Sequence, residues 1–200
     1  MYFNNGFTIK LKYRYVIKKI YSDRSMRICL IGDRFYSIVG VQKIKIKNIG
    51  EFLEELRNVL RGVSIQALDA NIVYGIEHIH EVLKITLEAI NRKITFANKA
   101  EIDLLLRLSY TNQISMAVKY GGLKNGSPGC FIFFSNDKTK VAKAKSHIEK
   151  MFSDIDNSII NASTIKRKMI SEQIGISSIK LFDDQTFIRY LIERACLIMK

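Results

Sequence analysis

The residues best suited to chemistry in this sequence are two histidines, His78 and His80, and the nearby glutamate Glu77. The histidines are two positions apart in a segment with helical periodicity, so they point to different faces and are poorly placed to share a metal ion. Glu77-x-x-His80 has the spacing of half a di-iron site in a helical bundle, but a second copy is absent from the sequence. We therefore expect no metal site.

A second candidate is the glycine-rich stretch GGLKNGS, which begins at Gly121 and Gly122. A phosphate-binding loop has a lysine after its last glycine, and it follows a strand and precedes a helix. Here Ser127 follows Gly126 directly, and the stretch lies between an expected helix and an expected strand. We predict instead that Gly121 or Gly122 takes the left-handed conformation that ends a helix in a Schellman motif, with Leu123 as the apolar contact.

The sequence contains no recognisable nucleophile. No serine lies in a G-x-S-x-G motif, and no cysteine has a base partner at a known spacing. Asp69 ends an expected strand and could act as an acid, but such an aspartate more often caps the following turn. Cys29, Cys130 and Cys196 form no CxxC pair, so we expect thiols rather than disulfides or zinc ligands. We predict a protein that is not an enzyme, with no cofactor and no small-molecule substrate.

The composition indicates a basic globular protein. The chain has 200 residues, 48% of them hydrophobic, which suffices for a substantial core. Its formal net charge is +13, and residues 1–50 hold eleven Lys or Arg against two Asp. Such a field favours nucleic acid as a partner, although a lysine-rich chain can also be basic without binding anything. No apolar run approaches a membrane span of ~18 residues and no secretory signal is evident, so we expect a cytoplasmic protein without a membrane partner.

Alternating apolar and polar residues predict a β-rich N-terminal part. The expected strands run over 7–17, 25–31 and 35–47, with a hairpin turn at Gly32-Asp33. The last strand places Lys43, Lys45 and Lys47 on one side, where they could contact a nucleic-acid backbone or protect a sheet edge from aggregation.

Beyond Ile49 the apolar residues follow a helical period, interrupted by buried strands within VSIQALDA and CFIFFS. The expected helices are one that ends at Gly62, one with an apolar stripe from Ile76 to Ile90, one opened by an Asn98–Glu101 capping box, one within QISMAVKYGG, and three over 138–152, 165–174 and 186–199. We predict an α/β or α+β fold in which helices pack on a central mixed sheet. Residues 1–33 would form a basic, β-rich extension of a domain over 34–200.

Three motifs in order resemble the small kinase-binding subunit of the KEOPS complex, the archaeal and eukaryotic TPRKB-type family. They are a strand ending in Asp69-Ala70, a helix start with Gly75, Glu77 and His78, and a turn and helix with Ser109, Gln113-Ile114, Ala117 and Gly122-Leu123. The resemblance covers about residues 35–200 and is densest over 64–123. This chain has Tyr110 and Asn112 where archaeal members usually carry glycine and arginine, and Asn112 is similar to eukaryotic members.

The resemblance implies a non-catalytic subunit with two partners. One is the small atypical kinase/ATPase of the complex. The other is tRNA, held in archaeal systems by its 3′ CCA end while the complex makes threonylcarbamoyl-adenosine next to the anticodon. The alternative is a free-standing basic protein that binds tRNA or other nucleic acid through its N-terminal sheet.

Apolar and polar side chains at the family motifs are the candidates for these contacts. For the kinase they are Ile192, Leu197 and Ile198 of the C-terminal helix, with Ser115 and Met116 as an extension, although the first three could equally be core. For RNA they are His78, Asn112, Gln113 and Lys124, with Lys43, Lys45 and Lys47 as a row that contacts the backbone. Tyr110 could stack on a base or simply pack.

Overall fold

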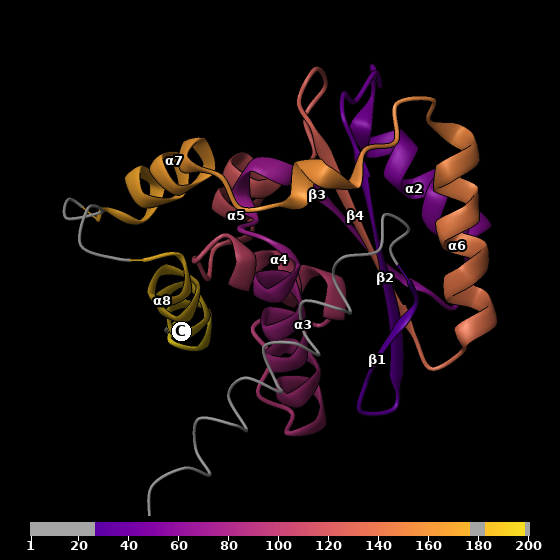
Figure 1. Ribbon diagram of the computed structural model, residues 1–200. Helices are drawn as coiled ribbons and strands as arrows, with labels where there is room; N and C mark the ends of the chain where they lie inside the picture. Colours follow the sequence, from indigo (N-terminus) through magenta and orange to yellow (C-terminus); the bar gives the residue numbers. More distant parts are fainter. Residues whose placement is uncertain (1–26, 177–182, 199–200) are drawn as a thin grey trace, which may run out of the picture.

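The computed structural model of the protein describes residues 27–176 and 183–198, and all structural statements below concern these ranges. The strand expected over 7–17 lies outside them, as does most of the expected N-terminal extension. Figure 1 shows a central sheet with helices on both of its faces.

The sheet contains four strands in the order β1-β2-β4-β3, and every neighbouring pair is antiparallel. The strands are β1 (Cys29–Ile31), β2 (Arg34–Val41), β3 (Ser64–Asp69) and β4 (Gly129–Ser135). An α+β fold is thus confirmed, whereas the expected mixed sheet is wrong. The reason is that β2 and β3 run in the same direction, but β4 lies between them and is antiparallel to both.

The β1–β2 hairpin turns at Gly32 and Asp33, as the sequence predicts. Gly32 has a φ of +58°, a conformation that costs glycine little. Strand β1 is hydrogen-bonded to β2, with Leu30 opposite Phe35 and Ile31 opposite Arg34. It is therefore part of the same sheet as the other strands, although the sequence prediction assigned it to the extension.

Two layers of helices cover the sheet (Figure 1). One face carries α2 (Ile49–Val59) and α6 (Lys138–Met151), and the other carries α3 (Ile76–Asn91), α4 (Ala100–Leu108) and α5 (Ile114–Gly121). Helices α7 (Thr164–Ile174) and α8 (Asp184–Cys196) lie outside the second layer, and short 3-10 helices occur at η1 (Ala70–Ile72) and η2 (Asn157–Ile160). The helices expected over 138–152, 165–174 and 186–199 are confirmed with small shifts at their ends.

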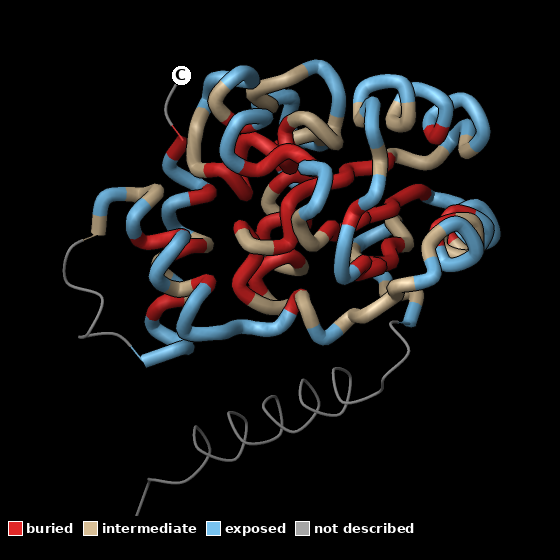
Figure 2. The backbone as a smooth tube through the Cα atoms, turned by 90° about the horizontal axis from the view of Figure 1, so that it is seen from above, coloured by how far each residue is buried: buried red, intermediate tan, exposed pale blue. Residues whose placement is uncertain are grey.

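Alternation along the strands divides the core between the two layers. Toward α3 and α4 the strands direct Ile38, Leu68 and Ile132, and toward α2 and α6 they direct Val39, Ala67 and Phe131. Figure 2 shows the buried residues gathered in the centre, with the exposed residues on the outer helical surfaces. No helix in the described ranges is long and apolar enough to cross a lipid bilayer.

Local hydrogen bonds fix the helix ends. Asn48 caps α2 by accepting from the N–H of Glu51 at 3.3 Å. The expected Asn98 capping box is wrong, because α4 begins after Lys99, which makes no side-chain cap. Asp103 in the first turn of α4 instead accepts from the N–H of Phe96 at 2.6 Å, so the preceding loop folds back over the helix start.

The expected Schellman motif at the end of α5 is also wrong. Gly122 caps the helix with φ −64° and ψ 154°, and neither Gly121 nor Gly122 has a positive φ. A Cβ at Gly121 would overlap Ser109 Oγ and Ile72 Cδ1, and one at Gly122 would lie 2.5 Å from the Val118 carbonyl oxygen. These glycines therefore allow close packing rather than a left-handed turn.

Candidate functional site

The histidine of the family motif is part of the core. His78 is fully buried, its Nδ1 accepts from the N–H of Tyr74 at 3.2 Å, and its Nε2 lies 2.9 Å from Tyr110 Oη. Because Nδ1 accepts, the neutral ring carries its proton on Nε2 and donates it to Tyr110. Burial, aided by the charge of Lys166, lowers the pKa of His78 to about 3. The prediction that His78 contacts RNA directly is therefore wrong, since its side chain does not reach the surface.

Tyr110 ends α4 in a left-handed conformation, with φ +54°. Its N–H donates to the Arg107 carbonyl and the N–H of Thr111 donates to the Leu106 carbonyl, both at 3.2 Å. These are the two hydrogen bonds of a Schellman motif, whose left-handed position is usually glycine. The conformation costs an L-residue roughly 1–2 kcal/mol. Tyr110 is partly buried and bonded to His78, so it packs and is not placed to stack on a base.

Two further hydrogen bonds hold the turn that follows. Thr111 Oγ1 accepts from the N–H of Gln113 at 3.2 Å, and Gln173 of α7 donates to the Ser109 carbonyl at 3.1 Å. Asn112 and Gln113 are exposed at the start of α5. The turn over 109–113 therefore presents these two amide side chains from a fixed backbone.

The lysine row lies beyond the sheet. Strand β2 ends at Val41, so the strand expected over 35–47 is too long. Its remainder is still paired: the N–H of Ile44 donates to the Ser127 carbonyl at 2.9 Å, and the N–H of Gly126 donates to the Ile44 carbonyl at 2.7 Å. Ile46 also donates its N–H to Asn125 Oδ1 at 3.2 Å. These bonds join the segment over 42–48 to the turn that follows α5, and both lie at the top of the molecule in Figure 1.

This pairing brings together four of the predicted RNA-binding residues. Ile44 is buried beneath the segment, while the residues on either side of it are exposed. The exposed residues are Lys43, Lys45 and Lys47 of the segment and Lys124 of the paired turn. No Asp or Glu occurs in the sequence between Asp33 and Glu51, or between Asp103 and Asp137, so neither segment has an acidic residue of its own. Sequence periodicity could place the three lysines on one side but not beside Lys124.

Two of these lysines are oriented by carboxylates from elsewhere in the chain. Lys124 Nζ lies 3.4 Å from Asp69 Oδ2 and donates to the Tyr120 carbonyl at 3.1 Å. Asp69 also accepts from the N–H of Asn71 at 2.9 Å, so its predicted role as a cap is confirmed. Lys45 Nζ lies 3.3 Å from Asp154 Oδ2, and hydrogen bonds from Ser153 and then from Lys45 lower the pKa of Asp154.

The residues predicted to bind a kinase lie on α5, on α8 and directly after the end of α8. On the C-terminal side Leu197 is 70% exposed, Ile192 is half-buried, and Ile198 is 9% exposed. On α5, Ser115 is exposed and Met116 is half-buried. Both helices pack on α4, and of the three C-terminal residues Leu197 is the one most available to a partner.

Buried polar groups that the sequence analysis missed hold α8 in place. Arg107 Nε lies 2.7 Å from Asp103 Oδ2, and Arg107 Nη1 donates to the Ala195 carbonyl at 3.1 Å. At the other end of α8, the Tyr74 hydroxyl donates to Asp184 Oδ1 at 2.6 Å, and burial with this bond raises the pKa of Tyr74 to about 12. The four-residue spacing of Asp103 and Arg107 could have indicated an ion pair on one helix face. The Tyr74–Asp184 hydrogen bond joins segments far apart in the sequence, so no local pattern indicates it.

Lys166 is a further buried group without a sequence signal. It lies in α7 and is 6% exposed. Its Nζ donates to the carbonyl oxygens of Val73, at 3.2 Å, and Ile159. Burial lowers the pKa of Lys166 to about 8. The lysine therefore links α7 to both short 3-10 helices from inside the protein.

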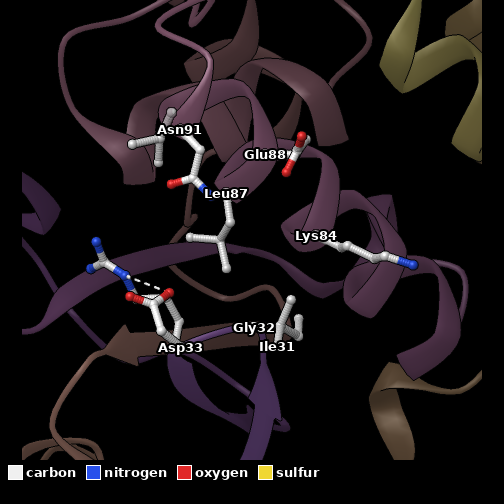
Figure 3. A pocket seen from close by; sticks show the side chains of 9 residues that line it. Ile31, Gly32, Asp33, Lys84, Leu87, Glu88 and Asn91 are labelled. Atoms are coloured by element: carbon white, nitrogen blue, oxygen red, sulfur yellow. Dashed lines mark ion pairs between the residues drawn. The ribbon is translucent and has the colours of Figure 1, made fainter.

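A hollow of about 200 Å³ lies between the β1–β2 turn and α3 (Figure 3). In this hollow the Leu87 side chain points toward Ile31, and the charged residues Asp33, Lys84 and Glu88 lie around these apolar groups. Asp33 lies 3.8 Å from Arg34, so part of that charge is compensated internally. The hollow is smaller than typical ligand pockets of ~300–1,000 Å³, and we assign no ligand to it. In the described residues no group of three or more His, Cys, Asp or Glu is placed to hold a metal ion.

The fold and the surface define an α+β domain with one basic end and an anchored C-terminal helix. No protein-family model matches this sequence, and comparison with curated proteins finds no match either.

Proposed function

We propose that this protein is a non-catalytic subunit of the KEOPS type, which binds a small atypical kinase/ATPase and helps to recruit tRNA for threonylcarbamoyl-adenosine modification next to the anticodon. The observation that carries the RNA half of the proposal is the pairing of residues 44–46 with residues 125–127. It joins two lysine-bearing segments into one surface, in which Asp69 pairs with Lys124 and Asp154 with Lys45, and the remaining positive charge attracts a phosphate backbone.

The turn over 109–113 supports recognition of an RNA end. Single-stranded ends are read by side chains that hydrogen-bond to exposed base edges, and a fixed backbone reduces the entropy lost on binding. Asn112 and Gln113 are exposed amides on such a backbone. The turn also contains part of the third family motif.

The C-terminal helix supports a protein partner. Interfaces gain most of their energy from a few apolar or aromatic anchors on a rigid support. Leu197 is 70% exposed and follows a helix that is tied to α4 through Arg107 and Ala195.

Co-purification with the small atypical kinase of the same organism tests the protein-binding half. We expect Leu197→Glu to abolish co-purification, whereas Ile165→Glu, at a residue of α7 that is 73% exposed, leaves it intact. Ile198→Glu is unsuitable because that residue is buried, so its loss of binding would report unfolding. Loss of the kinase with both exposed variants, or with neither, contradicts docking through the C-terminal face.

The RNA half is tested by binding of tRNA with and without its 3′ CCA. We expect weaker binding of the trimmed tRNA, and unchanged affinity would contradict end recognition. Deletion of residues 1–26 separates the proposal from a free-standing nucleic-acid-binding protein, and it leaves β1 in place. The free-standing alternative predicts loss of most RNA binding, whereas our proposal predicts that kinase binding is retained.

A further inference from the structure

The basic end of the molecule also carries an exposed aromatic ring. Tyr120 is 38% exposed near the end of α5, and it is the one aromatic residue among the exposed large hydrophobic side chains of the described ranges. Its backbone carbonyl accepts from Lys124 Nζ at 3.1 Å. Tyr120 therefore lies directly beside the turn that pairs with the lysine segment.

One cationic group lies close to this ring, and others follow along the adjoining turn and segment. Lys119 Nζ lies 5.9 Å from the centroid of the Tyr120 ring, within the range of a cation–π contact. Lys124 lies in the turn after the helix and is oriented by Asp69. Beyond it, Asn125 and Gly126 are hydrogen-bonded to the segment that carries Lys43 and Lys47.

We propose that Tyr120, Lys119 and Lys124 form, with the lysine segment over 43–47, a binding surface for single-stranded nucleic acid in which a base stacks on the Tyr120 ring. Proteins that hold single strands combine a positive track for the backbone with aromatic side chains for the bases. Both parts are present here on elements that are hydrogen-bonded to each other. The inference rests on the RNA-binding half of the proposed function and is independent of kinase docking.

The inner face of α5 explains why Tyr120 is directed outward. Ala117 and Gly121 are buried against the core, and a side chain at Gly121 would overlap Ser109 and Ile72. Because this face has room only for small residues, the larger residues of the helix lie on its exposed face. Ile114 and Val118 are each 53% exposed on the same helix and provide apolar surface without an aromatic ring.

A fluorescently labelled single-stranded RNA and a duplex of the same sequence test the proposal with the full-length protein. We expect Tyr120→Ala to weaken single-strand binding about tenfold, because a stacked base is lost, while Tyr120→Phe remains within about twofold. The duplex should bind more weakly and respond little to either substitution. Lys119→Gln should reduce the slope of log affinity against log salt by about one.

The matched control is Val118→Ala, which removes exposed apolar area from the same helix. We expect it to leave RNA binding unchanged. If Tyr120→Ala binds the single strand as tightly as the unaltered protein, or if Val118→Ala weakens binding equally, stacking on Tyr120 is refuted. The Leu197→Glu co-purification is read separately, so a failure of the kinase half and a failure of this inference give different results.

Discussion

The two helical layers of this protein are built from different kinds of buried residue. The buried side chains that α2 and α6 contribute are all apolar: Leu56, Val141, Ala144 and Ile148. Helices α3, α4 and α7 on the other side also bury polar and charged groups, namely His78, Thr86, Asp103, Arg107, Lys166 and Ser171.

This difference indicates which layer fixes the orientation of the neighbouring helices and turns. Apolar contacts stabilise without strong direction, whereas a buried hydrogen bond or ion pair is favourable only in a narrow geometry. The buried polar groups on this side of the sheet connect α4 with α8, α7 with the end of η1, and α3 with the turn after α4. We infer that α2 and α6 serve as scaffold, while the second layer fixes the surfaces proposed to meet partners.

The largest expected effect comes from breaking the buried ion pair of the polar layer. Asp103→Ala leaves Arg107 charged and buried and removes the acceptor for the Phe96 N–H, so we expect a loss of about 3–5 kcal/mol in the free energy of unfolding. Urea denaturation followed by circular dichroism measures it. Glu88→Ala, which breaks the exposed pair with Arg92, is the control and should cost less than about 1 kcal/mol. Equal losses in the two variants would show that the buried ion pair contributes no more to stability than the exposed one.

In the apolar layer, Ile148→Ala removes a fully buried side chain from α6. We expect a loss of about 3 kcal/mol from transfer and cavity terms, without any change in the pH dependence of stability. The variant should not increase hydrogen exchange at the Thr111 amide more than at the other amides of the protein. Selective loosening of that turn by this variant would contradict the division into scaffold and orienting layers.

The polar layer should also make stability depend on pH. The pKa of His78 is about 3 in the folded protein against 6.5 for a free histidine, so the unfolded chain binds more protons between these values. Stability from His78 is complete above pH 6.5 and falls as pH decreases, by about 1.4 kcal/mol per pH unit at most. His80 has a lowered pKa and adds a change of the same sign.

Urea denaturation gives the change in the free energy of unfolding between pH 6.5 and pH 5. The contribution of His78 is the difference between this change in the unaltered protein and the same change in His78→Gln. A direct control is the imidazole titration of His78 by nuclear magnetic resonance. The ring should remain neutral at pH 5, and a midpoint near 6.5 would contradict the buried assignment.

A smaller effect is expected from Tyr110→Phe, which keeps the ring and removes its hydroxyl. The Nε2–H of His78 then lacks this acceptor, and we expect a loss of about 1–2 kcal/mol. Hydrogen exchange should increase at Thr111 and Asn112 more than in α2 or α6. Unchanged exchange in the turn would show that the His78 bond does not hold it.

Much of the fold follows from local patterns in the sequence. Alternation predicts β1 and β2, short buried runs predict β3 and β4, and helical periodicity places the helices within a few residues of their ends. The order of the strands is set by long-range pairing, which has no local signal, and the mixed sheet was wrong for that reason. Glycine marks only some helix ends: Gly175 ends α7 with a positive φ, whereas Tyr110 and Lys93 take positive φ after α4 and α3, and Gly121 and Gly122 do not.

The candidate site was predictable only in part. The lysine row could be recognised from its alternation, and Asp69 was correctly expected to cap a turn. Burial of His78 depends on Tyr74, which lies four residues before it, and on Tyr110, which comes from a distant segment. Tyr120 had no distinguishing pattern, since its exposure follows from the close approach of Gly121 to the core.

A second basic surface competes with the basic end for RNA if charge alone decides binding. Helix α6 carries the five lysines Lys138, Lys140, Lys143, Lys145 and Lys150, on the scaffold side of the molecule. A protein that bound RNA through net charge would use this helix as readily as the basic end. The two surfaces lie on different elements, so a map of contacts separates them.

Hydrogen–deuterium exchange of the protein with and without tRNA tests the central claim most directly. We predict slower exchange in segments 42–48, 109–113 and 119–126 when tRNA is bound, with α6 unaffected. Protection confined to α6 would contradict the account, because RNA would then bind the scaffold layer rather than the surface formed by the lysine segment, the turn after α4 and the end of α5.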